Sequence, residues 1–183
     1  MKDFLDRKMK FLKDIRGFSL AETMVTLLIY FFVAAACYSA LVYGSNSWKV
    51  NSVAVELQQE LRKAMDWITE DLRQSGTSTI TDVPVDGQPH NTIPFKLCTG
   101  ASNGNISWAG STTQYSKRGT GSAQLLRTTG AQSKVIAQNF QTVQFRRQNT
   151  SENVVDVALT VQKNIIGGRM LAMSSNFQVR MRN

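Results

Sequence analysis

The feature that most constrains this chain is a run of 26 residues, Thr23 to Trp48, without a charged side chain. As an α-helix rising about 1.5 Å per residue, the run would be about 39 Å long, which exceeds the roughly 30 Å of a hydrocarbon core. It therefore predicts a membrane-spanning helix near the N-terminus. Glu22 stands at its edge. A carboxylate entering lipid costs about 2.5–3.5 kcal/mol, so we expect Glu22 to have a partner and a function.

The residues before the run are basic. Residues 1–17 contain six basic and three acidic side chains, and such an excess holds the N-terminal side in the cytoplasm and sends the rest of the chain outward. A secretory signal has its small-residue cleavage site after the apolar segment. Here the small residue at the basic-to-apolar junction, Gly17, precedes that segment, so the order is wrong for an ordinary secretory signal.

The sequence Gly-Phe-Ser-Leu-Ala-Glu from Gly17 to Glu22, with the apolar run after it, resembles the prepilin signature of type IV pilins and type II secretion pseudopilins. The resemblance implies that a prepilin peptidase cuts between Gly17 and Phe18 and methylates the new Phe18 amine. The apolar segment then stays in the mature protein. Removal of the charged leader, residues 1–17, leaves a helix that can slide from the bilayer into a packed filament.

Two roles for Glu22 remain open. As a carboxylate near a helix N-terminus, it is attracted by the helix dipole and by the Phe18 amine of its own chain. The resemblance implies a second role, in which Glu22 pairs with the Phe18 amine of the neighbouring subunit and sets the register of subunits during assembly. We favour the second role, and the two are compatible.

Beyond the uncharged run, an amphipathic stretch predicts that the helix continues through residues 48–76. Apolar residues recur every three or four positions, at Val50, Val53, Leu57, Leu61, Ala64, Met65, Ile68 and Leu72. Gly76 is the predicted end of a helix that begins at Phe18. Tyr43 and Trp48 stand where aromatic residues anchor at a membrane surface, and an ordinary packing role is the alternative for either. Major pilins commonly have a proline where this chain has Ser39, so the residues from Gly44 to Ser47 are the alternative flexible point.

The chain after Gly76 is rich in Thr, Ser, Gly and Asn and shows short runs of alternating apolar and polar residues. This pattern predicts antiparallel strands at 92–98, 105–109, 113–117, 122–128, 134–139, 143–146, 155–161 and 177–182. We predict an α+β fold in which a long N-terminal helix, half of it transmembrane, packs on an antiparallel sheet, which is the pilin layout. The predicted parts are the leader at 1–17, the transmembrane and polymerisation half-helix at 18–47, and the head at 48–183.

Six basic residues of the head are candidates for binding an anion or a partner: Arg146, Arg147, Arg180, Arg182, Lys117 and Arg118. Aligned across adjacent strands, they would form a basic face able to bind DNA phosphates. The alternative is that they are solvated or dock to an acidic neighbour. We favour the alternative because no aromatic side chain is interleaved with them.

No pattern in the sequence indicates an enzyme, so we predict no catalytic residue, cofactor or metal site. His90 is the single histidine, and a solvated loop position beside Pro89 is its predicted place. The glycine-rich stretch at Gly119 lacks the end of a phosphate-binding loop and predicts a hairpin turn. Asp82 and Asp86 flank Pro84 and could contribute to a calcium site, although solvated turn residues are the favoured interpretation.

Two cysteines are too far apart in the expected layout for an intramolecular disulfide. Cys37 lies in the apolar span, where it is predicted to be a small buried residue. Cys98 belongs to the exported part. It is either buried in a strand, which we favour, or a free thiol able to pair with a partner in an oxidising compartment.

Residues 60–76 and the ending Phe-Gln-Val-Arg-Met-Arg-Asn also look similar to J-type minor pseudopilins and W-type minor pilins. The resemblance implies a minor subunit that helps to start a type IV pilus or a type II secretion pseudopilus. A DNA- or ligand-binding receptor pilin and a major pilin are the alternatives. The implied partners are the prepilin peptidase, other pilins or pseudopilins, the inner-membrane assembly platform and inner-membrane lipid, with DNA not favoured. The implied location is the bacterial inner membrane, with a periplasmic head, and then the filament.

Overall fold

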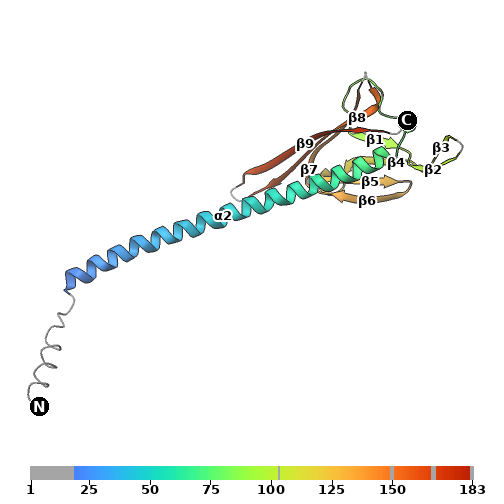
Figure 1. Ribbon diagram of the computed structural model, residues 1–183. Coiled ribbons are helices and arrows are strands. Elements are labelled where there is room, and N and C mark those ends of the chain that lie inside the picture. Colours follow the sequence, from blue (N-terminus) through green and yellow to red (C-terminus); the bar gives the residue numbers. More distant parts are fainter. Residues whose placement is uncertain (1–18, 103, 149–150, 166–167, 182–183) are drawn as a thin grey trace, which may run out of the picture. The chain divides into compact units, whose positions relative to one another are not determined.

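The computed structural model describes residues 19–102, 104–148, 151–165 and 168–181. The helix α2 spans Leu20–Arg73 without interruption, and the strands follow it in the chain (Figure 1). The chain divides into two compact units between Ser47 and Trp48. The described part of the first unit is the apolar half of α2, and the second unit contains the other half of α2 and all described strands. Gly44 and the residues up to Ser47 are helical.

The described strands of the second unit form three antiparallel sheets. Their orders are β1-β4-β5-β6, β2-β3 and β7-β8-β9. The bounds are β1 Thr92–Phe95, β2 Cys98–Ser102, β3 Asn105–Trp108, β4 Thr113–Arg118, β5 Gln124–Thr129, β6 Gln132–Ala137, β7 Phe140–Gln148, β8 Ser151–Asn164 and β9 Met170–Arg180. The predicted α+β class, a long N-terminal helix packed on antiparallel strands, is confirmed. The prediction of one sheet is wrong.

The chain leaves the first sheet after β1, and this is one reason why the strands form three sheets instead of the predicted one. The strand predicted over 92–98 is two strands in two sheets, because Leu97 forms a bridge with Ser75 and the Cys98 N–H donates to the Gln74 carbonyl at 2.9 Å. These bonds direct the chain to the end of α2. β1 remains paired with β4, whereas β2 pairs with β3.

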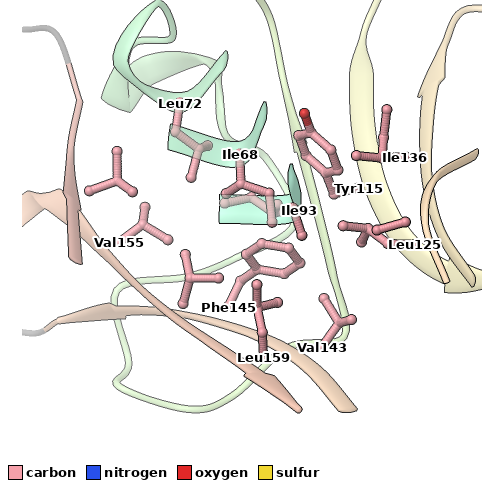
Figure 2. Packing of buried hydrophobic residues seen from close by; sticks show 14 of the residues in the cluster. Ile68, Leu72, Ile93, Tyr115, Leu125, Ile136, Val143, Phe145, Val155 and Leu159 are labelled. Atoms are coloured by element: carbon pink, nitrogen blue, oxygen red, sulfur yellow. The ribbon is translucent and has the colours of Figure 1, made fainter. Parts of the chain in front are cut away.

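The core lies between the second half of α2 and the two larger sheets. Figure 2 shows Ile68 and Leu72 of α2 facing Val155 and Phe145 on one side and Tyr115 on the other. The predicted apolar stripe is confirmed where it meets the strands, because Leu57, Leu61, Ala64, Ile68 and Leu72 are all buried. The predicted inward rows of β7 and β8 are also confirmed: Val143, Phe145, Val155, Val157, Leu159 and Val161 are at most 2% exposed.

Gly76 has a different role from the predicted one. α2 ends at Arg73, and Gly76 has an extended backbone with φ of −114°, so it does not end the helix in a left-handed conformation. A Cβ at position 76 would lie 2.5 Å from the Cη2 atom of Trp108 in β3. Glycine is needed here because the tryptophan ring packs directly against the backbone. The predicted turn at Gly119 is confirmed, since Gly119 and Gly121 connect β4 to β5 with φ of 85° and 64°.

Candidate functional site

The first half of α2 presents a continuous apolar surface. Every residue from Ser19 to Asn46 is exposed in the isolated chain, including Leu27, Phe31 and Leu41 at 68%, 69% and 72%. Soluble proteins rarely leave a contiguous apolar area of this size uncovered. By length and composition, α2 could cross a membrane. This half-helix therefore needs lipid or other apolar helices around it.

Three hydroxyl groups in this half-helix have backbone partners within it. Thr23 Oγ1 donates to the Leu20 carbonyl at 2.8 Å, Thr26 Oγ1 to the Glu22 carbonyl at 2.7 Å, and Ser39 Oγ to the Ala35 carbonyl at 2.8 Å. A polar group in lipid must find its hydrogen-bond partner inside the protein. These hydroxyls meet that requirement, so they do not prevent the segment from entering an apolar environment.

Glu22 lies in the first turn of α2, where the helix dipole favours a negative charge. Its backbone N–H bonds to Ser19 Oγ at 3.4 Å, and its side chain is exposed. No basic side chain among residues 19–102, 104–148, 151–165 and 168–181 forms an ion pair with this carboxylate. Gly17 and Phe18, the predicted cleavage and methylation residues, lie outside the described residues. Both proposed pairings of Glu22 with a Phe18 amine therefore stay predictions.

The candidate basic residues do not form one face. Arg146 and Arg147 are neighbours in β7, and side chains alternate between the two faces of a strand, so only one of them can point outward. Arg147 is 7% exposed and donates from Nη1 to the Val83 carbonyl at 3.2 Å. Its predicted place on an outward basic face is wrong. Arg180 is exposed in β9, whereas Arg182 lies outside the described residues.

The remaining candidates are held by other partners or belong to another sheet. Arg146 Nη2 lies 3.5 Å from Asp156 Oδ2, and Asp156 also accepts hydrogen bonds from Gln148 Nε2 at 2.9 Å. Lys117 belongs to β4 and donates to the Gln141 carbonyl at 2.6 Å. Arg118 is the last residue of that strand.

A hollow of about 530 Å³ lies on the outer face of the β7-β8-β9 sheet. Its side-chain walls include Pro89, Gln144, Arg146, Asp156, Asn176 and Gln178. Among the described residues that line it, the charged side chains are those of Arg146 and Asp156, which form the ion pair described above. The hollow is therefore polar but nearly neutral, which does not favour DNA or another polyanion.

A cluster of hydrogen-bonded polar side chains joins α2 to the β4 and β5 strands. The Asp71 carboxylate, 8% exposed, accepts from the Tyr115 hydroxyl at 2.7 Å and from Arg127 Nε at 2.6 Å. Arg127 Nη2 donates to the second Asp71 oxygen at 3.3 Å, which makes the ion pair bidentate. Two cations cover the Trp67 ring beside this cluster: Arg127 Cζ at 5.7 Å and Lys134 Nζ at 4.6 Å from the ring centroid.

Burial and hydrogen bonding shift two pKa values in this cluster. Burial raises the pKa of the Tyr115 phenol well above its ordinary value, and the hydrogen bond to the Asp71 carboxylate raises it further. The hydrogen bond to Asp71 also raises the pKa of the Arg127 guanidinium. The cluster thus holds an un-ionised phenol beside an ion pair, an arrangement that ties α2 to β4 and β5.

Sequence reasoning missed Asp71, although a signal was present. Positions 57, 61, 64, 68, 71 and 75 follow one another at alternating spacings of four and three, and all except 71 carry an apolar or small residue. A carboxylate at position 71 therefore interrupts the buried stripe, and buried charges are paired. That rule predicts a cation opposite Asp71. The identity of the cation, Arg127, depends on the packing of the sheet.

The structure also places the three other residues singled out in the sequence, His90, Cys37 and Cys98. His90 is not in a free loop, because its backbone forms a two-hydrogen-bond bridge with Phe145, both bonds being 2.8 Å. Its Nε2 atom lies 3.8 Å from Asp86 Oδ1, which also accepts from the Gln88 N–H. Cys37 is exposed in the isolated chain, and half-buried Cys98 donates from Sγ to the Gly100 carbonyl at 3.4 Å. Both thiols are free.

A scan against protein-family models gives no match for this chain, and a search of curated protein sequences gives no match either. The geometry itself defines the class: an α+β protein whose N-terminal helix is apolar enough to cross a membrane and whose second unit packs the same helix on antiparallel sheets.

Proposed function

We propose that this chain is a minor pilin or pseudopilin, a structural subunit of a type IV pilus or a type II secretion pseudopilus. The observation that carries the proposal is the uninterrupted helix α2. Its first half is exposed and apolar with an acidic first turn, and its second half buries one stripe of side chains in an α+β unit. Together with the Gly17–Phe18 junction in the sequence, this arrangement suits a subunit that moves from lipid into a filament.

The lipid bilayer and the interior of a filament offer the first half of α2 similar apolar environments. Lipid tails and the apolar flanks of neighbouring helices both cover the exposed surface of residues 19–46, so transfer between them loses little apolar burial. A charged leader on the same helix would oppose this transfer, because six basic side chains favour the cytoplasmic membrane surface. Cleavage by a prepilin peptidase after Gly17 removes that restraint. Before assembly the protein is then a single-pass inner-membrane protein with its second unit in the periplasm.

The alternative of a DNA receptor gains no support from the basic residues. Arg147 is buried, Arg146 pairs with Asp156, and Lys117 donates to a backbone carbonyl of its own chain. A contiguous basic surface is what DNA binding needs. Other pilin-like subunits and the inner-membrane assembly platform are therefore the partners that we propose.

The decisive experiment is to determine the N-terminus of the mature protein. We expect cells that contain a prepilin peptidase to yield a chain beginning at N-methylated Phe18, and cells without it to yield the full chain. Gly17→Ala should slow or stop this maturation, and Ser19→Ala serves as a neighbouring control that is processed normally. Mass spectrometry of the purified protein distinguishes these products. A mature chain that starts at Met1, or anywhere other than Phe18, would overturn the proposal.

A further inference from the structure

The two larger sheets have four edge strands, and three of these edges are protected against pairing with another strand. β1 is 4 residues long and contains Pro94. β6 carries Lys134 and pairs with β5 through a register shift. The edge of β7 is covered, because Phe145 exchanges hydrogen bonds with His90 and the Arg147 carbonyl accepts from the Gly87 N–H. Short length, proline, lysine, bulges and covering segments are the usual means of blocking an edge.

The fourth edge, β9, has none of these features among the residues that the structure describes. It is 11 residues long, contains neither proline nor lysine, and pairs with β8 from Met170 to Arg180 without a register shift. Its one charged residue is Arg180, at the end. β9 is last in the order of its sheet and pairs there with β8 alone (Figure 1). A long and regular edge of this kind can accept another strand.

The hydrogen-bond pattern identifies the backbone groups that are free on this edge. The Met181 N–H bonds to the Asn153 carbonyl, and the Ile165 N–H bonds to the Arg169 carbonyl, each at 2.8 Å. Both bonds follow the β8–β9 register, so the odd-numbered residues of β9 direct their N–H and C=O groups toward β8. The even-numbered residues, Met170, Ala172, Ser174, Asn176, Gln178 and Arg180, direct theirs to the open side.

The inner face of β9 is also incompletely covered. Leu171, Met173 and Phe177 are only partly buried, although Val157, Leu159 and Val161 in the neighbouring strand are at most 1% exposed. Met65 of α2 is partly buried and accepts a hydrogen bond at Sδ from Ser175 Oγ at 3.3 Å. An apolar strip rich in methionine therefore runs beside the free edge, and methionine adapts well to different partners.

Next to this strip the flank of α2 is hollowed and slightly acidic. A hollow of about 440 Å³ is lined by Met65, Asp66, Thr69, Glu70, Arg73 and Gln74. Met65 joins it to β9 through its contact with Ser175. Asp66 and Glu70 are one helical turn apart and form no ion pair within the described chain, so their like charges repel. A basic side chain entering from outside would relieve this repulsion.

We propose that the free edge of β9 binds an extended segment of a different polypeptide, which adds as a further strand to the β7-β8-β9 sheet. The segment places alternate apolar side chains on the strip formed by Leu171, Met173, Phe177 and Met65, and a lysine or arginine near Asp66 and Glu70. Backbone hydrogen bonds to the even-numbered residues of β9 supply the affinity, and the side chains supply the selectivity.

A second copy of this chain fits the edge poorly. Lys163 Nζ lies 2.6 Å from the Glu56 carboxylate, and Lys163 is paired with Leu171, whereas Ser175 contacts Met65. β9 thus runs in the same direction as α2. In an antiparallel pair of two β9 strands matched along their length, the one basic side chain of the second strand, Arg180, would lie beside Met170, at the Glu56 end of α2 and away from Asp66 and Glu70.

The test is a titration of the full chain in lipid nanodiscs with a fluorescent peptide, Lys-Val-Thr-Val-Thr-Val-Thr-Val-Thr-Lys. We expect saturable binding that Asn176→Pro weakens at least about tenfold, because proline removes an outward N–H while leaving the bonds to β8 in place. Asn176→Ala keeps that N–H and should bind as the unmodified chain does. Hydrogen exchange should show added protection at Ala172, Ser174 and Gln178 when the peptide is bound.

Two further measurements keep the test decisive if Asn176→Pro fails to fold. A peptide N-methylated on alternate residues loses the same hydrogen bonds from the other side and should not bind. Replacing both lysines of the peptide by glutamate should weaken binding, and Glu70→Lys should reverse this preference. Equal binding to the proline and alanine variants, or no saturable binding, would overturn the proposal.

Dimerisation of the chain through β9 would also overturn it, because the occupant would then be a second copy. Processing at Phe18 is measured separately in cells. A failed titration therefore leaves the proposed function standing, and failed processing leaves the peptide result interpretable.

Discussion

At the scale of single residues, Asp71 links α2 to the β1-β4-β5-β6 sheet through three side-chain hydrogen bonds. It bonds to Tyr115 and Arg127, which lie 44 and 56 residues further along the chain. Contacts between such distant residues form only when the sheet has packed on the helix. The hydrogen bonds of Asp71 therefore exist only when this half of the core has assembled.

Removing the Asp71 charge should destabilise the second unit. Asp71→Asn leaves the partly buried Arg127 guanidinium without its counter-charge, and we expect a loss of about 3 kcal/mol in the free energy of unfolding. Urea unfolding of the full chain in detergent, followed by tryptophan fluorescence, measures this loss. Glu70→Gln, one position away on the exposed side, should change the free energy of unfolding by less than about 0.5 kcal/mol. Similar values for the two variants would show that the ion pair adds little stability.

Tyr115 predicts how stability depends on alkaline pH. Its pKa is raised in the folded protein, so above the ordinary tyrosine pKa of about 10 the unfolded chain loses this proton while the folded chain keeps it. The free energy of unfolding should then fall by up to about 1.4 kcal/mol per pH unit from this residue alone. Below pH 10 the contribution is constant. Tyr115→Phe should remove this part of the slope, as urea unfolding between pH 8 and 11 would measure. An unchanged slope would contradict the assignment.

At the scale of elements, α2 is one helix with two kinds of surface. Its first half is apolar on all sides, which is typical of a helix surrounded by lipid or by other helices. Its second half has one buried stripe, and most of the exposed residues outside this stripe are charged or polar. The change from one pattern to the other falls where the chain divides into its two units, between Ser47 and Trp48.

Glu22, in the first turn of this element, should matter for assembly and not for cleavage. Glu22→Ala leaves the Gly17–Phe18 junction unchanged, so we expect normal maturation but reduced incorporation into filaments. Comparison of processed protein in membranes and in sheared filaments, by immunoblot, measures the two steps separately. Thr26→Ala, one turn further along, removes a hydroxyl that already bonds to the Glu22 carbonyl and should be incorporated normally. Full incorporation of Glu22→Ala would leave the carboxylate only its local role at the helix N-terminus.

Among the strands, β8 shows what alternation in a sequence can predict. Val155, Val157, Leu159 and Val161 are apolar at every second position, and all four are buried because β8 is the central strand of its sheet. The same alternation at 177–182 predicted the last part of β9 but not residues 170–176, and it did not predict the environment of the strand. Phe177 is only partly buried because β9 is an edge strand. The alternation within one strand does not determine the order of the strands in the sheet.

At the scale of the whole molecule, the described core belongs entirely to the second unit, from Leu57 to Met181. A chain of residues 48–183 should therefore fold alone, and it should be soluble because the exposed apolar residues before Ser47 are removed. Circular dichroism and thermal unfolding of this fragment, without detergent, measure the outcome. The full chain should need detergent or lipid under the same conditions. An insoluble or unfolded fragment would mean that the first unit contributes to the core.

The sequence by itself determined the helix and its two halves, the α+β class and most strands, because hydrophobic periodicity and charge-free length are local properties that survive any packing. Tertiary structure alone decided that the strands form three sheets, that Arg147 is buried, and that Gly76 accommodates Trp108. It also decided that Asp71 meets Arg127 and that β9 is left as an open edge. Each of these depends on which distant segments lie side by side, and the pairing of distant segments follows from the packing of the whole core.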